Sequence, residues 1–297
     1  MLAAALLSAA AIVTGCAPDE PVPEAVATEA GAAAAVADDP HPPGGAVASA
    51  DGVIISFDER GDGERSVVFV HGWNCDRDYW QLQRDYLARS HRVISVDLAG
   101  HGRSGANRDQ WSIRAFAEDV AAVVRELKLN EVTLVGHSLG GPVVLETALL
   151  LPDRVRHVVG VDTLKTPDER FPDEQVEAFR QSLETDYAAT VTALVRTMFV
   201  DESHARVRDF VIRDMAASDP DVGIASLLAL SQYSPMPALR DLDVPLTLIN
   251  SSYEPTKFDV LNDRVGEFRL IEMDGVGHFP MLEDPTTFTN HLLEVLR

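Results

Sequence analysis

Short runs of β-branched residues alternate along this chain with segments of helical periodicity. The runs occupy residues 53–57, 66–71, 92–97, 131–136, 156–162, 246–250 and 268–273. Helical spacing occurs at residues 76–90, 112–129, 138–151 and 285–297. This alternation is typical of an α/β fold, with a mostly parallel sheet and helices on both faces. Ligands of such folds bind at the carboxyl ends of the strands, so the turns after the strands are where we expect chemistry.

The charge and the cysteine content exclude several classes of function. The chain has 47 acidic and 25 basic side chains, a formal net charge of −22, and no run of basic residues. A phosphate backbone would be repelled, so we expect no nucleic-acid partner. The two cysteines, Cys16 and Cys75, are too few for a disulfide framework or a cysteine-rich zinc site.

The N-terminal segment has the composition of an export signal followed by a tether. Residues 1–16 open with an apolar stretch rich in small side chains, as in a secretory signal. They end in Val-Thr-Gly-Cys, which resembles a bacterial lipobox and implies lipidation of Cys16. Residues 17–49 are rich in alanine, proline and acids without apolar periodicity, which predicts a disordered linker. One departure is that no Lys or Arg precedes Arg60.

Two localisations follow from the N-terminal segment. If the signal is real, the protein is exported as an outer-membrane lipoprotein or a periplasmic protein. Its contact with a membrane is then only through the N-terminal lipid anchor. If the signal is spurious, the same segment is an alanine-rich tail of a cytoplasmic protein.

The sequence Gly-His-Ser-Leu-Gly-Gly at residues 136–141 lies between a β-branched run and a helical segment. G-x-S-x-G in this context is the signature of a nucleophile elbow. The turn is so tight that its flanking positions tolerate only glycine-sized residues. It lifts the Ser138 hydroxyl above the sheet, at a helix N-terminus that favours negative charge. We therefore predict that Ser138 is a nucleophile.

Two other turns at strand ends carry residues suited to assist a nucleophile. Trp73 follows the run 66–71, where its backbone N–H and that of Leu139 are expected to point at one oxygen as an oxyanion hole. The Trp73 side chain is also a candidate for lining the substrate pocket. Near the C-terminus, His278 stands in a glycine-flanked turn after the last strand. A neutral imidazole there takes the Ser138 proton and later protonates the leaving group.

These motifs together resemble the α/β-hydrolase fold family. Four motifs occur in the order typical of the family. They are HGW at 71–73, the turn at 97–104, GHSLGG at 136–141 and GVGHFPMLEDP at 275–285. The resemblance covers residues 50–297 and implies one hydrolase domain, with serine first and histidine last in the triad. Serine at the nucleophile position differs from the haloalkane dehalogenase and epoxide hydrolase branches, which attack with a carboxylate.

The resemblance leaves two candidates for the acid of the triad. Most relatives carry it after the strand that follows the insert, where Glu254 stands in this chain without the usual glycine. Some relatives carry it one strand earlier, where Asp162 directly follows a β-branched run. A carboxylate at either turn orients the imidazole of His278. We favour Asp162 and keep Glu254 as the alternative.

Residues 164–240 form a long helical insert before the penultimate strand and resemble the helical cap of this family. Most of its aromatic and methionine side chains are expected in the core of the cap. A minority face the pocket and set the size of the substrate.

The predicted function is that of a serine hydrolase, a carboxylesterase-like enzyme that acts on small to medium carboxylic esters. Ser138 forms an acyl-enzyme that water hydrolyses, and no metal or organic cofactor is required. The expected partner is a small-molecule ester or lactone. Lactonase, C–C hydrolase and perhydrolase reactions on the same triad are alternatives, because the fold does not distinguish them. An alternative from another class is a ligand-binding sensor of this fold with little turnover.

Overall fold

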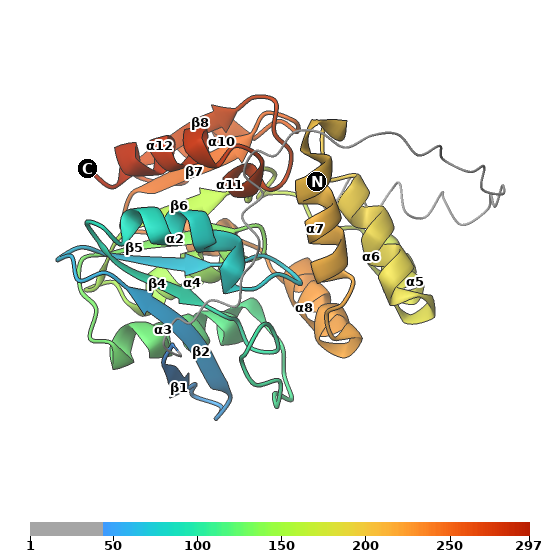
Figure 1. Cartoon of the computed structure of the whole chain (residues 1–297), viewed down its shortest axis with the longest axis horizontal. Coiled ribbons are helices and arrows are strands. Elements are labelled where there is room, and N and C mark those ends of the chain that lie inside the picture. The colour runs from blue at the N-terminus through green and yellow to red at the C-terminus, as the bar shows by residue number, and fades with distance from the viewer. Residues whose placement is uncertain (1–43) are drawn as a thin grey trace, which may run out of the picture.

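An eight-stranded sheet forms the centre of the computed structural model, which describes residues 44–297 (Figure 1). Its strands lie in the order β1-β2-β4-β3-β5-β6-β7-β8. Their bounds are Ala46–Ala48 (β1), Ile54–Arg60 (β2), Ser66–Val70 (β3), Arg92–Val96 (β4), Val132–His137 (β5), Val155–Val161 (β6), Leu246–Ser251 (β7) and Phe268–Met273 (β8). β2 is antiparallel to β1 and β4, and every other neighbouring pair is parallel. The mostly parallel sheet predicted from the sequence is confirmed.

The central strands are covered on both faces, which explains their uninterrupted β-branched runs. Every residue of β3 is buried. The register places Val70 of β3 beside Gly136 of β5, and His137 of β5 beside Val161 of β6. Because these parallel strands end together, the turns that follow them lie side by side at one edge of the sheet. That edge carries the residues singled out by the motifs.

Helices of the hydrolase domain pack in two pairs, α3 against α4 and α2 against α12. The bounds are Gln81–Leu87 (α2), Ile113–Glu126 (α3), Gly140–Leu150 (α4), Phe258–Asn262 (α10), Pro280–Glu283 (α11) and Pro285–Val295 (α12). In α3 the Ser112 hydroxyl caps the N-terminus by accepting the N–H of Ala115 at 3.0 Å. Ile113, Phe116 and Val120 share its buried face, as the periodicity predicts.

The segment between β6 and β7 forms the cap, as expected from its place before the penultimate strand. It contains α5 (Asp173–Thr185), α6 (Tyr187–Arg196), the 3-10 turn η2 (Glu202–His204), α7 (Ala205–Met215), α8 (Pro220–Gln232) and α9 (Met236–Arg240). Figure 1 shows α5 to α8 standing together beside one end of the sheet. Trp73 Nε1 donates to the carbonyl of Gly223 at 2.7 Å, and Asn74 Nδ2 donates to Tyr187 Oη at 2.6 Å. These bonds tie the cap to the turn after β3.

Two elements differ from the sequence-based expectation. Strand β1 lies inside the segment 17–49 that was expected to be linker, so ordered structure begins before residue 50. The segment 76–90 is a 3-10 turn, η1 (Arg77–Trp80), followed by the shorter helix α2. The Asp76 carboxylate accepts the N–H of Asp78 at 2.9 Å and so starts a tight turn there.

The structure does not test the predictions made for the N-terminal segment. The signal at residues 1–16, lipidation of Cys16 and most of the linker lie outside the described residues. Within residues 44–297, none of the helices has both the length and the apolar character needed to cross a membrane.

Candidate active site

Ser138 stands in a strained turn between β5 and α4. Its φ is +51°, a left-handed conformation that costs a non-glycine residue about 1–3 kcal/mol. Three hydrogen bonds hold the backbone there. The Ser138 N–H donates to Val161 at 3.0 Å, while its carbonyl accepts from Gly141 N–H at 2.9 Å and Thr163 Oγ1 at 2.7 Å. The surrounding structure therefore maintains the strain at this serine.

Close backbone approaches explain the glycines of the G-x-S-x-G motif. A Cβ on Gly136 would lie 2.2 Å from the carbonyl oxygen of Gly140. A Cβ on Gly140 would lie 2.6 Å from the carbonyl oxygen of His71 at the end of β3. Both distances are too short for a carbon–oxygen contact. A side chain at Gly136 would collide with the start of α4, and one at Gly140 would push the turn away from the end of β3.

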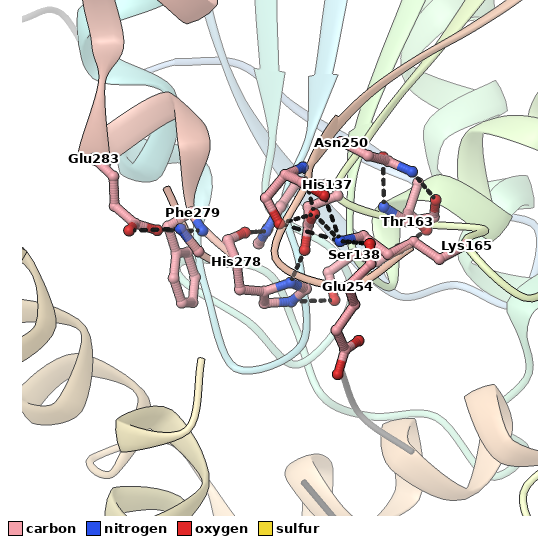
Figure 2. A network of polar contacts seen from close by, with 12 residues as sticks. His137, Ser138, Thr163, Lys165, Asn250, Glu254, His278, Phe279 and Glu283 are labelled. Atoms are coloured by element: carbon pink, nitrogen blue, oxygen red, sulfur yellow. Dashed lines mark hydrogen bonds and ion pairs between the residues drawn. The ribbon is translucent and has the colours of Figure 1, made fainter. Parts of the chain in front are cut away.

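The imidazole of His278 lies between Ser138 and Asp162, and Figure 2 shows Ser138 and His278 turned toward each other. Nε2 is 2.9 Å from Ser138 Oγ, and Nδ1 is 2.6 Å from Asp162 Oδ2. A carboxylate only accepts, so Nδ1–H donates to Asp162 in this arrangement. In the neutral ring, Nε2 is then free to accept the hydroxyl proton of Ser138. The contacts form a continuous path for a proton away from the serine.

Asp162 directly follows β6 and is buried, with a φ of +43°. Its Oδ1 accepts from the N–H and the Oγ of Ser251, both at 2.9 Å, and lies 2.8 Å from Lys165 Nζ. Burial by itself raises the pKa of this carboxyl. The hydrogen bond and charge of His278 and the charge of Lys165 outweigh burial and hold the pKa of Asp162 below its usual range. Asp162 is therefore an anion at neutral pH.

The main chain of His278 is fixed from two sides. Its N–H donates to the carbonyl of Met198, in the cap, at 2.8 Å. Its carbonyl accepts from Nε2 of His137, on β5, at 2.7 Å. Burial is the main cause that lowers the pKa of His137 to about 3, so this ring is neutral. His137 thus anchors the His278 turn without adding charge.

Glu283 clamps the same turn from α11. Its two carboxylate oxygens accept the N–H of Gly277 at 2.8 Å and the N–H of Phe279 at 2.9 Å, the residues on either side of His278. Figure 2 shows this carboxylate turned toward the backbone of the turn. The clamp limits rotation of the turn and so keeps the imidazole in place.

Glu254, the alternative acid, is not brought to His278. Figure 2 shows its carboxylate pointing away from the imidazole. Its backbone carbonyl accepts from Lys165 Nζ at 3.2 Å. The carboxylate that contacts Nδ1 of His278 is that of Asp162, so the geometry favours Asp162 over Glu254 as the acid.

The two expected oxyanion donors flank Ser138. Leu139 precedes the first turn of α4. On the other side, a Cβ on Gly72 would lie 3.2 Å from Ser138 Cβ, so the Gly72–Trp73 turn touches the elbow. Within residues 44–297, neither the Trp73 N–H nor the Leu139 N–H donates to another protein atom. Their role as oxyanion donors stays a prediction.

Two cavities open on Ser138 and His278. The larger has a volume of about 180 Å³ and has an apolar wall and a polar one, the latter including Lys165, Glu169 and Arg170. Its apolar wall consists of Pro142, Leu164, Pro167, Phe171, Leu230, Tyr233 and Pro235. The smaller is lined by Trp73 together with Cys75, Met198, Met215 and Phe279.

Three residues around the site were not singled out from the sequence. Lys165 lies in no motif, and it contacts Ser251 and Glu254, which are distant in sequence. Glu283 lies within the GVGHFPMLEDP motif, and its bonds to Gly277 and Phe279 are local in sequence. His137 lies inside the G-x-S-x-G motif, but its bond to the His278 carbonyl depends on the fold. Among the described residues, no group of three or more His, Cys, Asp or Glu side chains is arranged to hold a metal ion.

The fold combines a mostly parallel sheet with a helical cap. At the carboxyl edge of the sheet lie a serine in a strained turn, a histidine and an acid. These features together define a class of protein. The alpha/beta hydrolase family matches residues 67–291, and the chain belongs to that family. The pimeloyl-[acyl-carrier protein] methyl ester esterase of Aeromonas hydrophila subsp. hydrophila is 27% identical over 248 residues, which are 79% of this chain and 96% of that protein.

Two further matches are a shorter one in sequence and one in fold. The dihydrolipoyllysine-residue acetyltransferase component of the acetoin cleaving system of Cupriavidus necator is 34% identical over 111 residues. That match spans 37% of this chain and only 30% of the longer protein. Among solved structures, an esterase from Exiguobacterium antarcticum superposes with a TM-score of 0.78 at 22% identity, covering 85% of this chain and 99% of that one. This last likeness concerns the fold.

Proposed function

We propose that this hydrolase cleaves carboxylic esters of small to medium size through an acyl-enzyme on Ser138. The observation that carries the proposal is the hydrogen-bonded series from Ser138 Oγ through His278 to Asp162, with distances of 2.9 and 2.6 Å. His278 takes the serine proton as Oγ attacks the carbonyl carbon, and gives it to the leaving alcohol. Water then attacks the acyl-enzyme. His278 takes a proton from this water and gives it to Ser138 Oγ as the acid is released.

Charge develops on the carbonyl oxygen during both attacks. The N–H groups of Trp73 and Leu139 are the donors proposed for it. One such donor contributes about 10²–10³-fold to kcat. Asp162 stabilises the imidazolium that forms in each step and holds the ring in the tautomer that accepts the serine proton.

The cavity supports an uncharged, partly apolar substrate. Its walls at Leu164, Phe171 and Leu230 suit hydrocarbon groups, and its volume of about 180 Å³ suits small ones. Lactones are included in the proposal, because ring opening uses the same attack and the same leaving oxygen. C–C hydrolysis, perhydrolysis and ligand sensing with little turnover remain alternatives on the same residues.

The test is hydrolysis of p-nitrophenyl acetate, butyrate and octanoate by the wild-type chain and by Ser138→Ala. We expect saturable hydrolysis that falls by about 10³-fold or more in the variant. Ser252→Ala is the matched control, because Ser252 is an exposed serine whose Oγ donates to Asp274 at 2.6 Å. That variant should keep wild-type rates.

The outcomes separate the alternatives. Equal rates in Ser138→Ala and wild type would refute the proposed nucleophile. A folded wild-type chain that binds esters or lactones without turnover would favour the sensor. Activity that peaks at a short acyl chain would agree with the size of the cavity.

A further inference from the structure

Lys165 is a buried lysine that the mechanism above does not use. Only 8% of the residue is exposed. Its Nζ lies 2.8 Å from Asp162 Oδ1, 2.9 Å from the carbonyl of Ser251, 3.1 Å from Ser251 Oγ and 3.2 Å from the carbonyl of Glu254. Burial of an ammonium group is costly unless it is paired, and here one anion and three further oxygens surround it.

A bend in the backbone between Asp162 and Lys165 brings the Lys165 ammonium beside the Asp162 carboxylate. Asp162 and Leu164 both have positive φ values, +43° and +52°, which are uncommon for non-glycine residues. The bend returns the side chain of Lys165 toward the carboxylate three residues earlier. One oxygen of Asp162 then faces Lys165 and the other faces His278.

We propose that Lys165 is a positioning residue for the triad, which holds the carboxylate of Asp162 aimed at His278 and sets the pH range over which the site is active. The inference rests on the proposed function, because it assumes that His278 acts as the base for Ser138. Its physical cause is that a fixed positive charge near the imidazole disfavours the imidazolium form.

A purely structural role would also use these contacts, since Lys165 joins the turn after β6 to the turn after β7. The two roles differ in one respect. A tether made of hydrogen bonds affects the rate at every pH. A charge also moves the pH–rate profile along the pH axis.

Glu169 and Arg170 line the cavity beside the triad, but among residues 44–297 the ion pairs of Asp162 are with Lys165 and His278. His137 is neutral at the pH of the assay. Glu283 is an acid engaged with the backbone on the far side of the His278 turn. Glu254 contacts Lys165 through its backbone carbonyl, which accepts from Nζ at 3.2 Å. Lys165 is therefore the cation directly paired with Asp162, apart from His278 itself.

The size of the effect follows from the hydrogen-bond geometry. Two hydrogen bonds and the width of a carboxylate separate Nζ from the imidazole, a span of about 6 Å. A unit charge at that span, in a medium of effective dielectric constant near 20 and with some screening, changes a proton equilibrium by about 1–2 pH units. In Lys165→Met we expect the acid limb of the pH profile of kcat/KM to move to higher pH by that amount.

The experiment measures kcat/KM for p-nitrophenyl acetate from pH 5 to 9, and in parallel the rate at which a fluorophosphonate labels Ser138. Lys165→Gln keeps hydrogen-bond donors but loses the charge, so it should show the same displaced limb as Lys165→Met. It also supplies the comparison if the methionine variant does not fold. Both variants should regain most of the wild-type rate at alkaline pH.

Lys257→Met is the matched control. Lys257 is on the same side of the domain, where its Nζ pairs with Asp168 and Glu169 at 2.8 Å. Removing that charge should leave the limb in place. An unmoved limb with a lower rate at every pH in both Lys165 variants would overturn the proposal. Labelling of Ser138 without ester hydrolysis would refute the esterase function alone, and no Ser138 labelling in the wild type would overturn both.

Discussion

Replacement of Asp162 by asparagine gives the sharpest test of the triad, because the structure dictates how the new amide must lie. Three donors converge on Oδ1 of Asp162, namely the N–H and Oγ of Ser251 and the ammonium of Lys165. The amide oxygen must face these donors, so the amide NH₂ faces Nδ1 of His278. An NH₂ group donates, and Nδ1 must then accept.

The consequence is the wrong tautomer of His278. With Nδ1 as an acceptor, the neutral ring carries its proton on Nε2 and cannot take the proton of Ser138. A serine–histidine site locked in this way loses about 10⁴-fold in kcat. This corresponds to about 5.4 kcal/mol of transition-state stabilisation, at 1.36 kcal/mol for each tenfold change.

The assay is kcat/KM for p-nitrophenyl acetate at pH 7.5, with Glu254→Gln as the matched control. Glu254→Gln should stay within about twofold of wild type, whereas Asp162→Asn should fall by the amount given above. Thermal unfolding must accompany the rates, because Lys165 loses its buried counter-charge, a change that costs about 3–5 kcal/mol. A folded Asp162→Asn variant within tenfold of wild type, or an equal loss in Glu254→Gln, would refute the assignment of the acid.

Three further predictions follow from the same contacts. Glu283→Gln leaves one buried N–H, of Gly277 or Phe279, without a carboxylate oxygen, and should lower the free energy of unfolding in urea by about 1–3 kcal/mol. Because the pKa of Asp162 is lower in the folded than in the unfolded chain, its stabilisation is present above the ordinary value of 3.8 and is lost as pH falls below it. Urea unfolding at pH 7 and pH 3 should show that loss, and a smaller one in Asp162→Asn. Cys16→Ser should abolish incorporation of labelled palmitate in a bacterial host, and equal labelling of both chains would contradict lipidation.

The contact between Ser138 and His278 was predictable because local pattern and fold agree at their positions. Ser138 stands where a β-branched run meets a helix, and two backbone approaches leave room only for glycine beside it. His278 follows the last strand of the sheet. Parallel strands in register bring such turns to one edge, so the meeting of the two residues follows from the topology.

The choice between Asp162 and Glu254 could not be made from the sequence. Each follows a strand, and β6 and β7 are neighbours, so either turn lies near His278. The deciding contact is that of Asp162 Oδ2 with His278 Nδ1, which joins positions 116 residues apart in the chain. Spacing alone does not reveal such convergence.

Strand β1 was missed for a different reason. Its three residues, Ala46–Ala48, are small and carry no apolar alternation. They form a strand because the edge of β2 is available for pairing, as Val47 opposite Ile55 shows. A tertiary contact determines the structure of this segment, against a weak local preference.

The bond between the His278 N–H and the Met198 carbonyl bears on how this enzyme can be recombined with its relatives. A Cβ on Gly277 would lie 2.1 Å from that carbonyl oxygen, so the cap backbone rests directly on the histidine turn. A chimera that exchanges residues 164–240 for another cap must supply a carbonyl at the same place. One that does not will carry an intact serine and a misplaced histidine, and its loss of activity will then reflect geometry and not the specificity of the transplanted cap.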